Sequence, residues 1–229
     1  MHTSPLTAPD VSGSSPTRPG RLVTDATTRA LHGLMAFSFG LAYLSADSET
    51  WRVLHVCMGY TFAGAFVMRL AFGWWGPRQA RLSLLWRRGE ALGRFVRQFS
   101  RPQAWSWAWL QQLPLMAVYA SLLLLLLAAL PITATGWISY ESWGPDVWVE
   151  WMADLHETLG EGMLLAVFVH LAAVVLQGVW RRSPYWQRML SGRLPERGPH
   201  VAATPIWLAA VITVTLGFWL AVDGGWLRL

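Results

Sequence analysis

LHETLGEGMLLAVFVHLAAVVLQGVW, residues 155–180, is the stretch that decides the fold, because it is long and apolar enough to cross a bilayer and carries two histidines. His156 and His170 are 14 residues apart, which on an α-helix is about 21 Å along the axis. Fourteen steps of about 100° bring the second side chain back to within roughly 40° of the first. Both imidazoles are therefore predicted to lie on one helix face, one towards each end. This pattern indicates two metal centres stacked across the membrane.

The composition of the whole chain is that of an integral membrane protein. Of its 229 residues, 54% are hydrophobic and 14% are charged, against about a quarter charged in an ordinary soluble domain. The single Cys57 excludes an internal disulfide and a cysteine-ligated iron–sulfur cluster. The net charge of +5 does not indicate nucleic-acid binding, because the basic residues, all arginines, lie mostly in loops between apolar segments.

Five apolar segments are predicted to span the membrane. They cover approximately residues 30–46, 53–75, 113–138, 155–180 and 203–222. The connections between them alternate between arginine-rich and arginine-poor, as the positive-inside rule requires for five spans. We therefore expect a multi-pass protein of the bacterial inner membrane, with its N-terminus in the cytoplasm and its C-terminus in the periplasm.

These spans divide the chain into three predicted parts. Residues 1–28 are rich in Ser, Thr, Pro and Gly and are expected to form a disordered cytoplasmic tail. Residues 29–192 form a four-helix domain, in which an amphipathic helix at about residues 80–100 lies in the cytoplasmic interface. Residues 193–229 comprise a linker and one further transmembrane helix. The predicted fold class is all-α, an integral membrane helical bundle of four core helices plus an extra C-terminal one.

Four histidines fall within the predicted spans, and the topology assigns each of them a depth. His32 is near the start of a span that enters from the cytoplasm, whereas His55 is near the start of one that enters from the periplasm. In the fourth span His156 is near the periplasmic surface, and His170 lies about 21 Å deeper. Depth therefore pairs His32 with His170, and His55 with His156.

The ligand type of each pair favours haem over other metal sites. Two imidazoles without a carboxylate or thiolate are too few for tetrahedral zinc, but they match the two axial positions of a haem iron. Gly40, Gly59 and Gly160 follow the histidines by one or two helical turns and would leave room for a flat group, although small residues are common at any membrane helix interface. One such histidine is also explained as a buried polar group hydrogen-bonded across helices. Four that pair by depth favour ligation.

Five runs of sequence carry a family resemblance. They are TRALHGL around His32, WRVLHVCMGY around His55, RLAFGWWGPRQARLS, LPITATGW, and the LHETL run with its second histidine. On these runs, over about residues 27–192, the chain resembles the bacterial cytochrome b561 family, which is related to the b-type subunits of nickel–iron hydrogenases. The resemblance implies two haem b groups with His32, His170, His55 and His156 as axial iron ligands, and a quinone pool as partner. SRPQAWSWAWLQQ replaces the GHNPLG-like run of the hydrogenase subunits, which argues against a hydrogenase anchor.

We expect a quinone-linked electron-transfer oxidoreductase that moves electrons between the quinone pool and a periplasmic partner, either a c-type cytochrome or a dehydrogenase subunit. The loop between the third and fourth spans has four acidic residues and no basic one, which suits a basic c-type cytochrome and slows the approach of superoxide. The alternatives are a stand-alone superoxide:quinone oxidoreductase, a b-type anchor subunit of a larger complex, and a haem-free metal carrier. The carrier would need intramembrane Asp or Glu beside the histidines, and the middle of the spans has none.

Three further side chains are candidates for supporting roles. Glu157 and Glu161 lie one helical turn apart and could handle the protons of quinone turnover, or could simply begin a helix whose dipole favours them. Arg69, at the cytoplasmic end of its span, could hold a haem propionate or extend to the lipid headgroups. Met163, on the histidine face, is interpreted as a packing residue.

Overall fold

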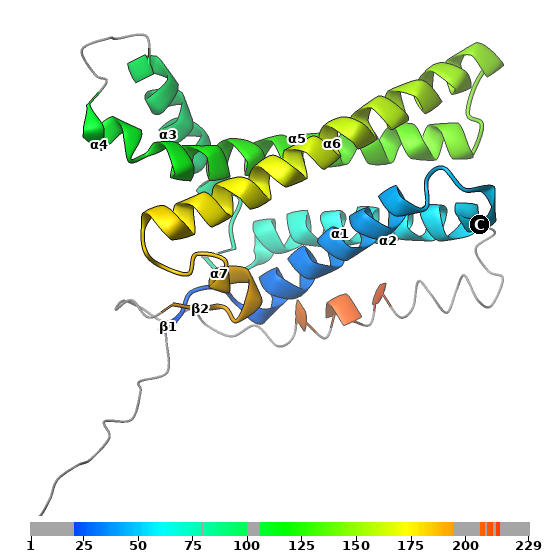
Figure 1. Cartoon of the computed structure of the whole chain (residues 1–229). Coiled ribbons are helices and arrows are strands. Elements are labelled where there is room, and N and C mark those ends of the chain that lie inside the picture. Colours follow the sequence, from blue (N-terminus) through cyan, green and yellow to red (C-terminus); the bar gives the residue numbers. More distant parts are fainter. Residues whose placement is uncertain are drawn as a thin grey trace, which may run out of the picture.

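The long helices of the bundle are arranged as two hairpins in the computed structural model, which describes residues 21–78, 80–99, 106–194, 207–208, 210–212 and 214–215. The long helices are α1 (Ala26–Leu44), α2 (Arg52–Trp75), α5 (Leu113–Tyr140) and α6 (Asp146–Trp180) (Figure 1). The shorter elements are β1 (Arg21–Leu22), η1 (Glu49–Trp51), α3 (Ser83–Phe99), α4 (Trp107–Leu110), α7 (Gln187–Leu190) and β2 (Arg193–Leu194). The all-α class predicted from the sequence is confirmed.

Three stretches of the described residues are long and apolar enough to cross a membrane. They are Glu49–Trp75, Trp107–Tyr140 and Asp146–Trp180, and they contain the second, third and fourth predicted spans. The first predicted span coincides with α1, whose 19 residues are not among the three. The fifth, at residues 203–222, lies mostly outside the described residues. The count of four core helices and one extra helix therefore stays a prediction.

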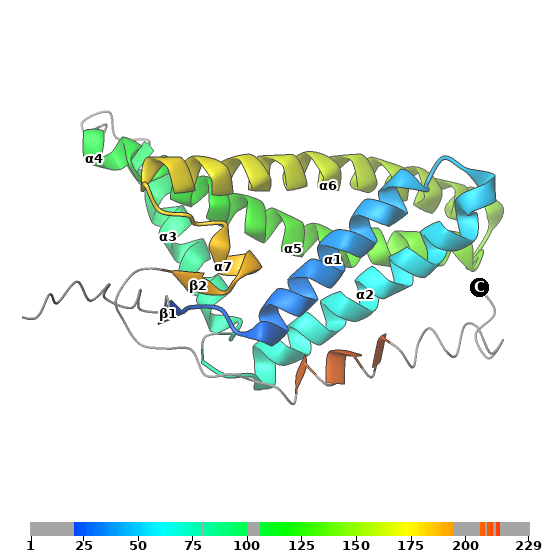
Figure 2. The same cartoon turned by 60° about the horizontal axis from the view of Figure 1, so that its bottom comes forward.

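Each hairpin is formed by two helices that are adjacent in the sequence. A short turn containing η1 joins α1 to α2, and a second turn joins α5 to α6, so that the partners in each pair run antiparallel (Figure 1). The first hairpin runs obliquely to α6 in the view of Figure 2. The most extensive contact between the long helices of the two hairpins is that of α2 with α5. Contacts of α1 and α6 with the opposite hairpin are smaller.

Local sequence explains where these helices begin. Asp25 caps α1, because its Oδ1 accepts a hydrogen bond of 2.9 Å from the backbone N–H of Thr28 and its Oδ2 accepts one of 2.8 Å from the Thr28 hydroxyl. The turn before α6 contains Gly144 at φ +120, a backbone conformation that residues with a Cβ rarely adopt.

Pro131 lies inside α5 and has no N–H to donate, so the helix loses one of its internal hydrogen bonds there.

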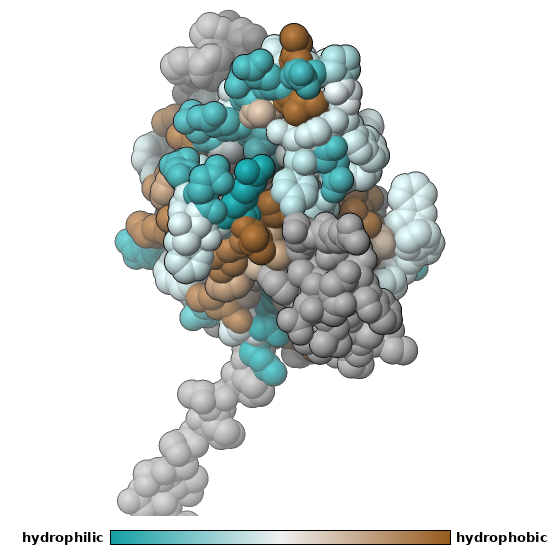
Figure 3. All heavy atoms as spheres, turned by 90° about the vertical axis from the view of Figure 1, so that its right-hand side faces the viewer, coloured by the Kyte–Doolittle hydropathy of each residue, from teal (hydrophilic) through white to brown (hydrophobic). Residues whose placement is uncertain are grey.

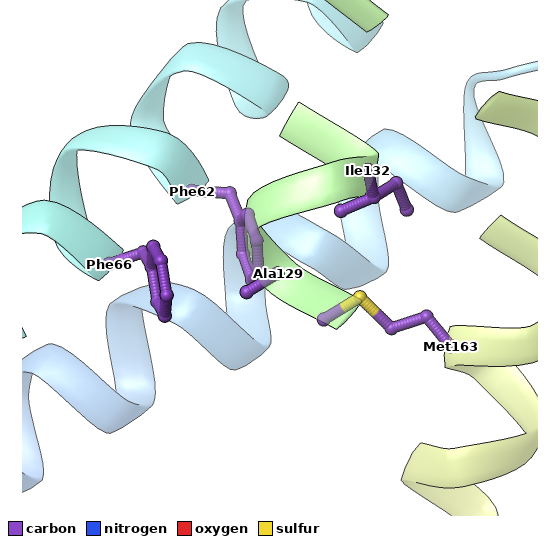
Figure 4. Close-up of a cluster of buried hydrophobic side chains, with 5 residues drawn as sticks. All are labelled: Phe62, Phe66, Ala129, Ile132 and Met163. Atoms are coloured by element: carbon purple, nitrogen blue, oxygen red, sulfur yellow. The ribbon is translucent and has the colours of Figure 1, made fainter. Parts of the chain in front are cut away.

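The central core lies where the two hairpins meet. Phe62 and Phe66 of α2 lie with Ala129 and Ile132 of α5 and Met163 of α6 in one buried cluster (Figure 4). Met163 therefore packs among apolar side chains, as its interpretation as a packing residue requires. This cluster will be called the central apolar cluster.

A short two-stranded sheet joins the segment before α1 to the segment after α7, at the end of the bundle away from the hairpin turns (Figure 1). β1 pairs antiparallel with β2, placing Arg21 opposite Leu194 and Leu22 opposite Arg193. Of the predicted tail at residues 1–28, residues 1–20 lie outside the described ones, whereas residues 21–28 form β1 and begin α1. The stretch predicted as an amphipathic helix forms α3, whose Phe95 stacks on Trp109 with ring centroids 4.5 Å apart.

Candidate functional site

The structure brings the four histidines together as two pairs, each of which joins α6 to the other hairpin. The rings of His55 on α2 and His156 on α6 have centroids 6.0 Å apart and are nearly perpendicular, at 88°. His32 on α1 lies close enough to His170 on α6 for their charged forms to repel each other. All four side chains are partly buried. His55 with His156 will be called the outer pair, and His32 with His170 the inner pair.

Backbone carbonyls fix the rings of the outer pair. The Nδ1 atom of His55 lies 2.8 Å from the carbonyl oxygen of Ala42 on α1, and that of His156 lies 2.9 Å from the carbonyl oxygen of Ile132 on α5. A carbonyl oxygen only accepts hydrogen bonds, so each Nδ1 carries the proton and donates it. The lone pair of each neutral ring is then on Nε2. This is the arrangement that metal-bound histidines usually have.

The segment LPITATGW of α5 is shaped around His156. A Cβ added at Gly136 would lie 2.7 Å from Cε1 of the His156 ring, so only glycine allows the ring to approach α5 this closely. The Thr135 hydroxyl donates a 2.8 Å hydrogen bond to the carbonyl of Pro131 and lies 3.5 Å from Nδ1 of His156. In the sequence this segment carries only the family resemblance. Its role in seating a histidine is not apparent there, because Gly136 has no distinguishing local pattern.

The inner pair has an equivalent contact, made by a hydroxyl. The Nδ1 atom of His170 lies 3.1 Å from the hydroxyl oxygen of Ser121, which is 3% exposed. That hydroxyl also lies 2.8 Å from the carbonyl of Ala117, to which it donates. Because its proton is used there, Ser121 accepts the Nδ1–H of His170. The lone pair of this ring is therefore also on Nε2.

The surroundings of the pairs accommodate a flat apolar group. Gly40, Gly59 and Gly160 are partly buried, and no heavy atom lies within 4 Å of the position that a Cβ would occupy on any of them. In the middle of the bundle, the central apolar cluster fills the space where the hairpins meet (Figure 4). Among the described residues, no group of three or more His, Cys, Asp or Glu side chains is arranged to hold a metal ion. A pair of imidazoles instead fits a metal whose other ligands come from a macrocycle.

The three supporting candidates differ in their exposure to solvent. Glu157 and Glu161 are exposed on α6. Arg69 is partly buried, and its Nη1 donates a 3.2 Å hydrogen bond to the carbonyl of Ala80. Arg69 therefore ties α2 to the loop that precedes α3.

The geometry of the two histidine pairs agrees with a comparison of the chain with known families. The family model described as prokaryotic cytochrome b561 matches residues 23–192, which is most of the chain. The chain belongs to the prokaryotic cytochrome b561 family. It is therefore a bacterial membrane protein, a b-type cytochrome that takes part in electron transfer, and its family binds haem b.

The remaining comparisons add no closer relative of this cytochrome. Comparisons with curated proteins and with solved structures gave no match. The matched region contains all four histidines and ends before the predicted fifth span. The resemblance read from the sequence over about residues 27–192 is confirmed.

Proposed function

We propose that this cytochrome holds two haem b groups and passes electrons between the quinone pool and a periplasmic redox partner such as a c-type cytochrome. His55 and His156 would hold the iron of the outer haem, and His32 and His170 would hold that of the inner haem. The observation that carries the proposal is the hydrogen bonding of the rings. Three of the four histidines use Nδ1 in a fixed contact, which leaves Nε2 to bind a metal.

The separation of the outer rings supports the same assignment. Two metal–nitrogen bonds of about 2 Å each, together with the two ring radii, place the centroids of axial imidazoles on one iron about 6 Å apart. The outer pair has this separation before any adjustment of α2 or α6. Haem, when bound, supplies a one-electron couple whose potential depends on its ligands and surroundings.

The chain itself supplies orientation and a dry interior. The carbonyls of Ala42 and Ile132 and the hydroxyl of Ser121 fix the ring planes, and by accepting the Nδ1 proton they make each histidine a stronger electron donor. The central apolar cluster excludes water from the bundle between the two pairs. In such a low-dielectric region a change in charge at one site is screened weakly.

The acidic residues at the end of α5 and the start of α6 support a basic protein as the redox partner. Their carboxylates are all exposed, and hydrophilic residues gather on this end of the molecule (Figure 3). Glu141 follows the last residue of α5, and Asp146, Glu150 and Asp154 lie in the first nine residues of α6. Opposite charge accelerates the encounter of two proteins, whereas like charge slows an anion such as superoxide. Glu157 and Glu161, exposed one turn further along α6, are placed to exchange protons with water during quinone turnover.

Three other functions remain as alternatives, and the experiments separate them. A superoxide:quinone oxidoreductase would be reduced by superoxide faster than by any protein donor, and an anchor subunit would copurify with a dehydrogenase. A haem-free metal carrier finds no cluster of suitable ligands in the described part of the chain.

The primary test is a reduced-minus-oxidised optical spectrum with a pyridine extract for haem content. We expect a low-spin b-type signal with about two haems per chain, and one fewer in His55→Ala. His2→Ala, outside the predicted spans, is the control and should keep both. A colourless protein from haem-replete cells would refute the proposal. Electron transfer is then measured with quinol and with a basic c-type cytochrome.

A further inference from the structure

A small folded unit closes the end of the bundle nearest the inner pair. It consists of residues 21–29 and 181–194 and will be called the cap. α7 turns back beneath α6 and contacts α1, while β1 and β2 hold the two chain segments together (Figures 1 and 2). The backbone N–H of Val23 donates a 2.7 Å hydrogen bond to the carbonyl of Gly192, which adds a further link.

Two arginines of the cap have guanidinium nitrogens that are shielded from solvent and lack a partner. Within the described part of the chain, the Nε atoms of Arg29 and Arg188 have no hydrogen-bond acceptor. Each guanidinium is held at its other end, because Nη1 of Arg29 donates to the carbonyl of Leu190 at 3.0 Å and Nη1 of Arg188 donates to the Tyr185 hydroxyl at 3.2 Å. A buried cationic donor without an acceptor is unfavourable, so it marks a position where an acceptor binds.

The backbone of the cap is adapted to this arrangement. Gly192 has φ +73, and a Cβ there would lie 2.7 Å from the backbone carbonyl oxygen of Thr24 and 2.9 Å from Nε of Arg29. Glycine at this position therefore leaves room for both the Thr24 backbone and the Arg29 guanidinium. The carbonyl of Leu190 in turn places Arg29 beside the helix that carries Arg188. Arg29 and Arg188, whose Nε atoms lack an acceptor, thus belong to one unit.

The register of the helices aligns this unit with the inner pair. Arg29 precedes His32 by three residues on α1, about 4.5 Å along the axis. Gln177 follows His170 by seven residues on α6, which returns it to the same face about 10.5 Å further on. Gln177 is 3% exposed, and its Oε1 has no partner among the described residues. Both helices therefore carry polar groups on the cap side of the inner pair.

Among the described residues, no carboxylate forms an ion pair with Arg29 or Arg188. The ion pairs formed within the described residues join Arg52 to Glu49 and Arg94 to Glu90, and neither involves the cap. Arg69, which the sequence suggests either for a haem propionate or for the lipid headgroups, donates from Nη1 to the carbonyl of Ala80. In the cap, the Nε donors of Arg29 and Arg188 are left for an anion near the inner pair.

We propose that Arg29 and Arg188 bind the propionate carboxylates of the inner haem, and that the Gln177 amide, turned to present its nitrogen, donates to the same carboxylates. This inference rests on the proposed function, because it requires a haem between His32 and His170. Arginine suits the task, since its planar fork can donate two parallel hydrogen bonds to one carboxylate. The unpartnered nitrogens are shielded from solvent, whereas a lipid headgroup would meet exposed ones.

The test uses Arg29→Gln and Arg188→Gln, singly and together, in the full chain. Arg181→Gln, an exposed arginine at the end of α6, is the matched control. Redox titration in the His55→Ala background reports the inner haem alone. Loss of a cation beside the haem disfavours the reduced form, so each variant should shift the equilibrium on the order of tenfold, or ~59 mV lower in midpoint potential. Arg29→Lys and Arg188→Lys retain the charge and should restore most of the potential.

The double variant should also release the inner haem on detergent washing, whereas the control should keep it. Unchanged potential and haem content in the double variant would overturn the inference. So would unchanged potentials with loss of a copurifying acidic phospholipid, which would assign the arginines to lipid. A wild-type protein without haem would refute the proposed function itself. If the double variant does not fold, the single variants and their lysine counterparts decide by their potentials.

Discussion

Replacing Gly136 with alanine would push a methyl group into the ring of His156. The added Cβ would lie 2.7 Å from Cε1 and 2.9 Å from Nδ1 of that ring. Carbon atoms in contact prefer about 3.5–4.0 Å, so the ring must move by about 0.8 Å or more. Such a displacement lengthens the 2.9 Å contact between Nδ1 and the Ile132 carbonyl beyond hydrogen-bond range.

The Gly136→Ala substitution has two costs to the stability of the fold and one effect on haem binding. Overpacking of this kind costs about 1–3 kcal/mol, and a lost hydrogen bond costs about 0.5–1.5 kcal/mol. Loss of a contact that orients a metal ligand typically weakens metal binding by about 10–100-fold. We therefore expect Gly136→Ala to weaken the outer haem by about this factor while the inner haem is retained.

The assay is haem content during dilution into apomyoglobin or another haem acceptor, together with redox titration. Gly162→Ala on α6 is the control, because it is exposed and no heavy atom lies within 4 Å of its Cβ position. Both substitutions make the same change in helix propensity, at most about 1 kcal/mol in favour of alanine. Equal haem retention and equal potentials in the two variants would refute the close seating of His156 against α5.

Three further predictions test other parts of the site. Ser121→Ala removes the acceptor of the His170 Nδ1 proton; the weaker ligand should raise the midpoint potential of the inner haem, and an unchanged titration would contradict the contact. The methyl group of Gly160→Ala would meet no protein atom within 4 Å other than its own helix backbone. We therefore expect this variant to fold, as circular dichroism would show, but to lose haem in a pyridine extract, because the proposed haem lies beside the position. Full haem occupancy would contradict this. Neutralising Glu141, Asp146, Glu150 and Asp154 together should slow electron exchange with a basic c-type cytochrome about tenfold or more at low salt, as stopped-flow kinetics would show; an unchanged rate would exclude this docking face.

The helices and the pairing of the histidines could be predicted because both predictions use local or one-dimensional properties. An apolar run of sufficient length forms a helix in lipid regardless of its neighbours, since its backbone groups must be satisfied internally. The 14-residue interval between His156 and His170 then determines that both rings share a face. The alternation of arginines between loops assigns a depth to each span. These properties suffice to pair the histidines without knowing how the hairpins cross.

The partners of those histidines came only from the tertiary structure. The acceptors beside His55 and His156 are the backbone carbonyls of Ala42 and Ile132, and a carbonyl has the same chemistry at every position in the sequence. Which carbonyl meets which ring depends on the rotation of one helix against another, within each hairpin and between them. The close contact of Gly136 with His156 depends on the same rotation.

The cap was even harder to predict from the sequence than the contacts of the histidines. Its strands are two residues long and pair across most of the sequence, so no periodicity indicates them. The sequence suggested Arg69 for either a haem propionate or the lipid headgroups, but gave no sign that Arg29 of α1 and the chain beside Arg188 would be joined by a hydrogen bond to Leu190. The sequence by itself determined a helical membrane protein with two pairs of histidines at two depths, because helix periodicity and charge are local. Only the tertiary structure decided what surrounds each pair. The rotation of each helix about its axis, and the way distant segments such as β1 and β2 come together, depend on packing across the whole bundle.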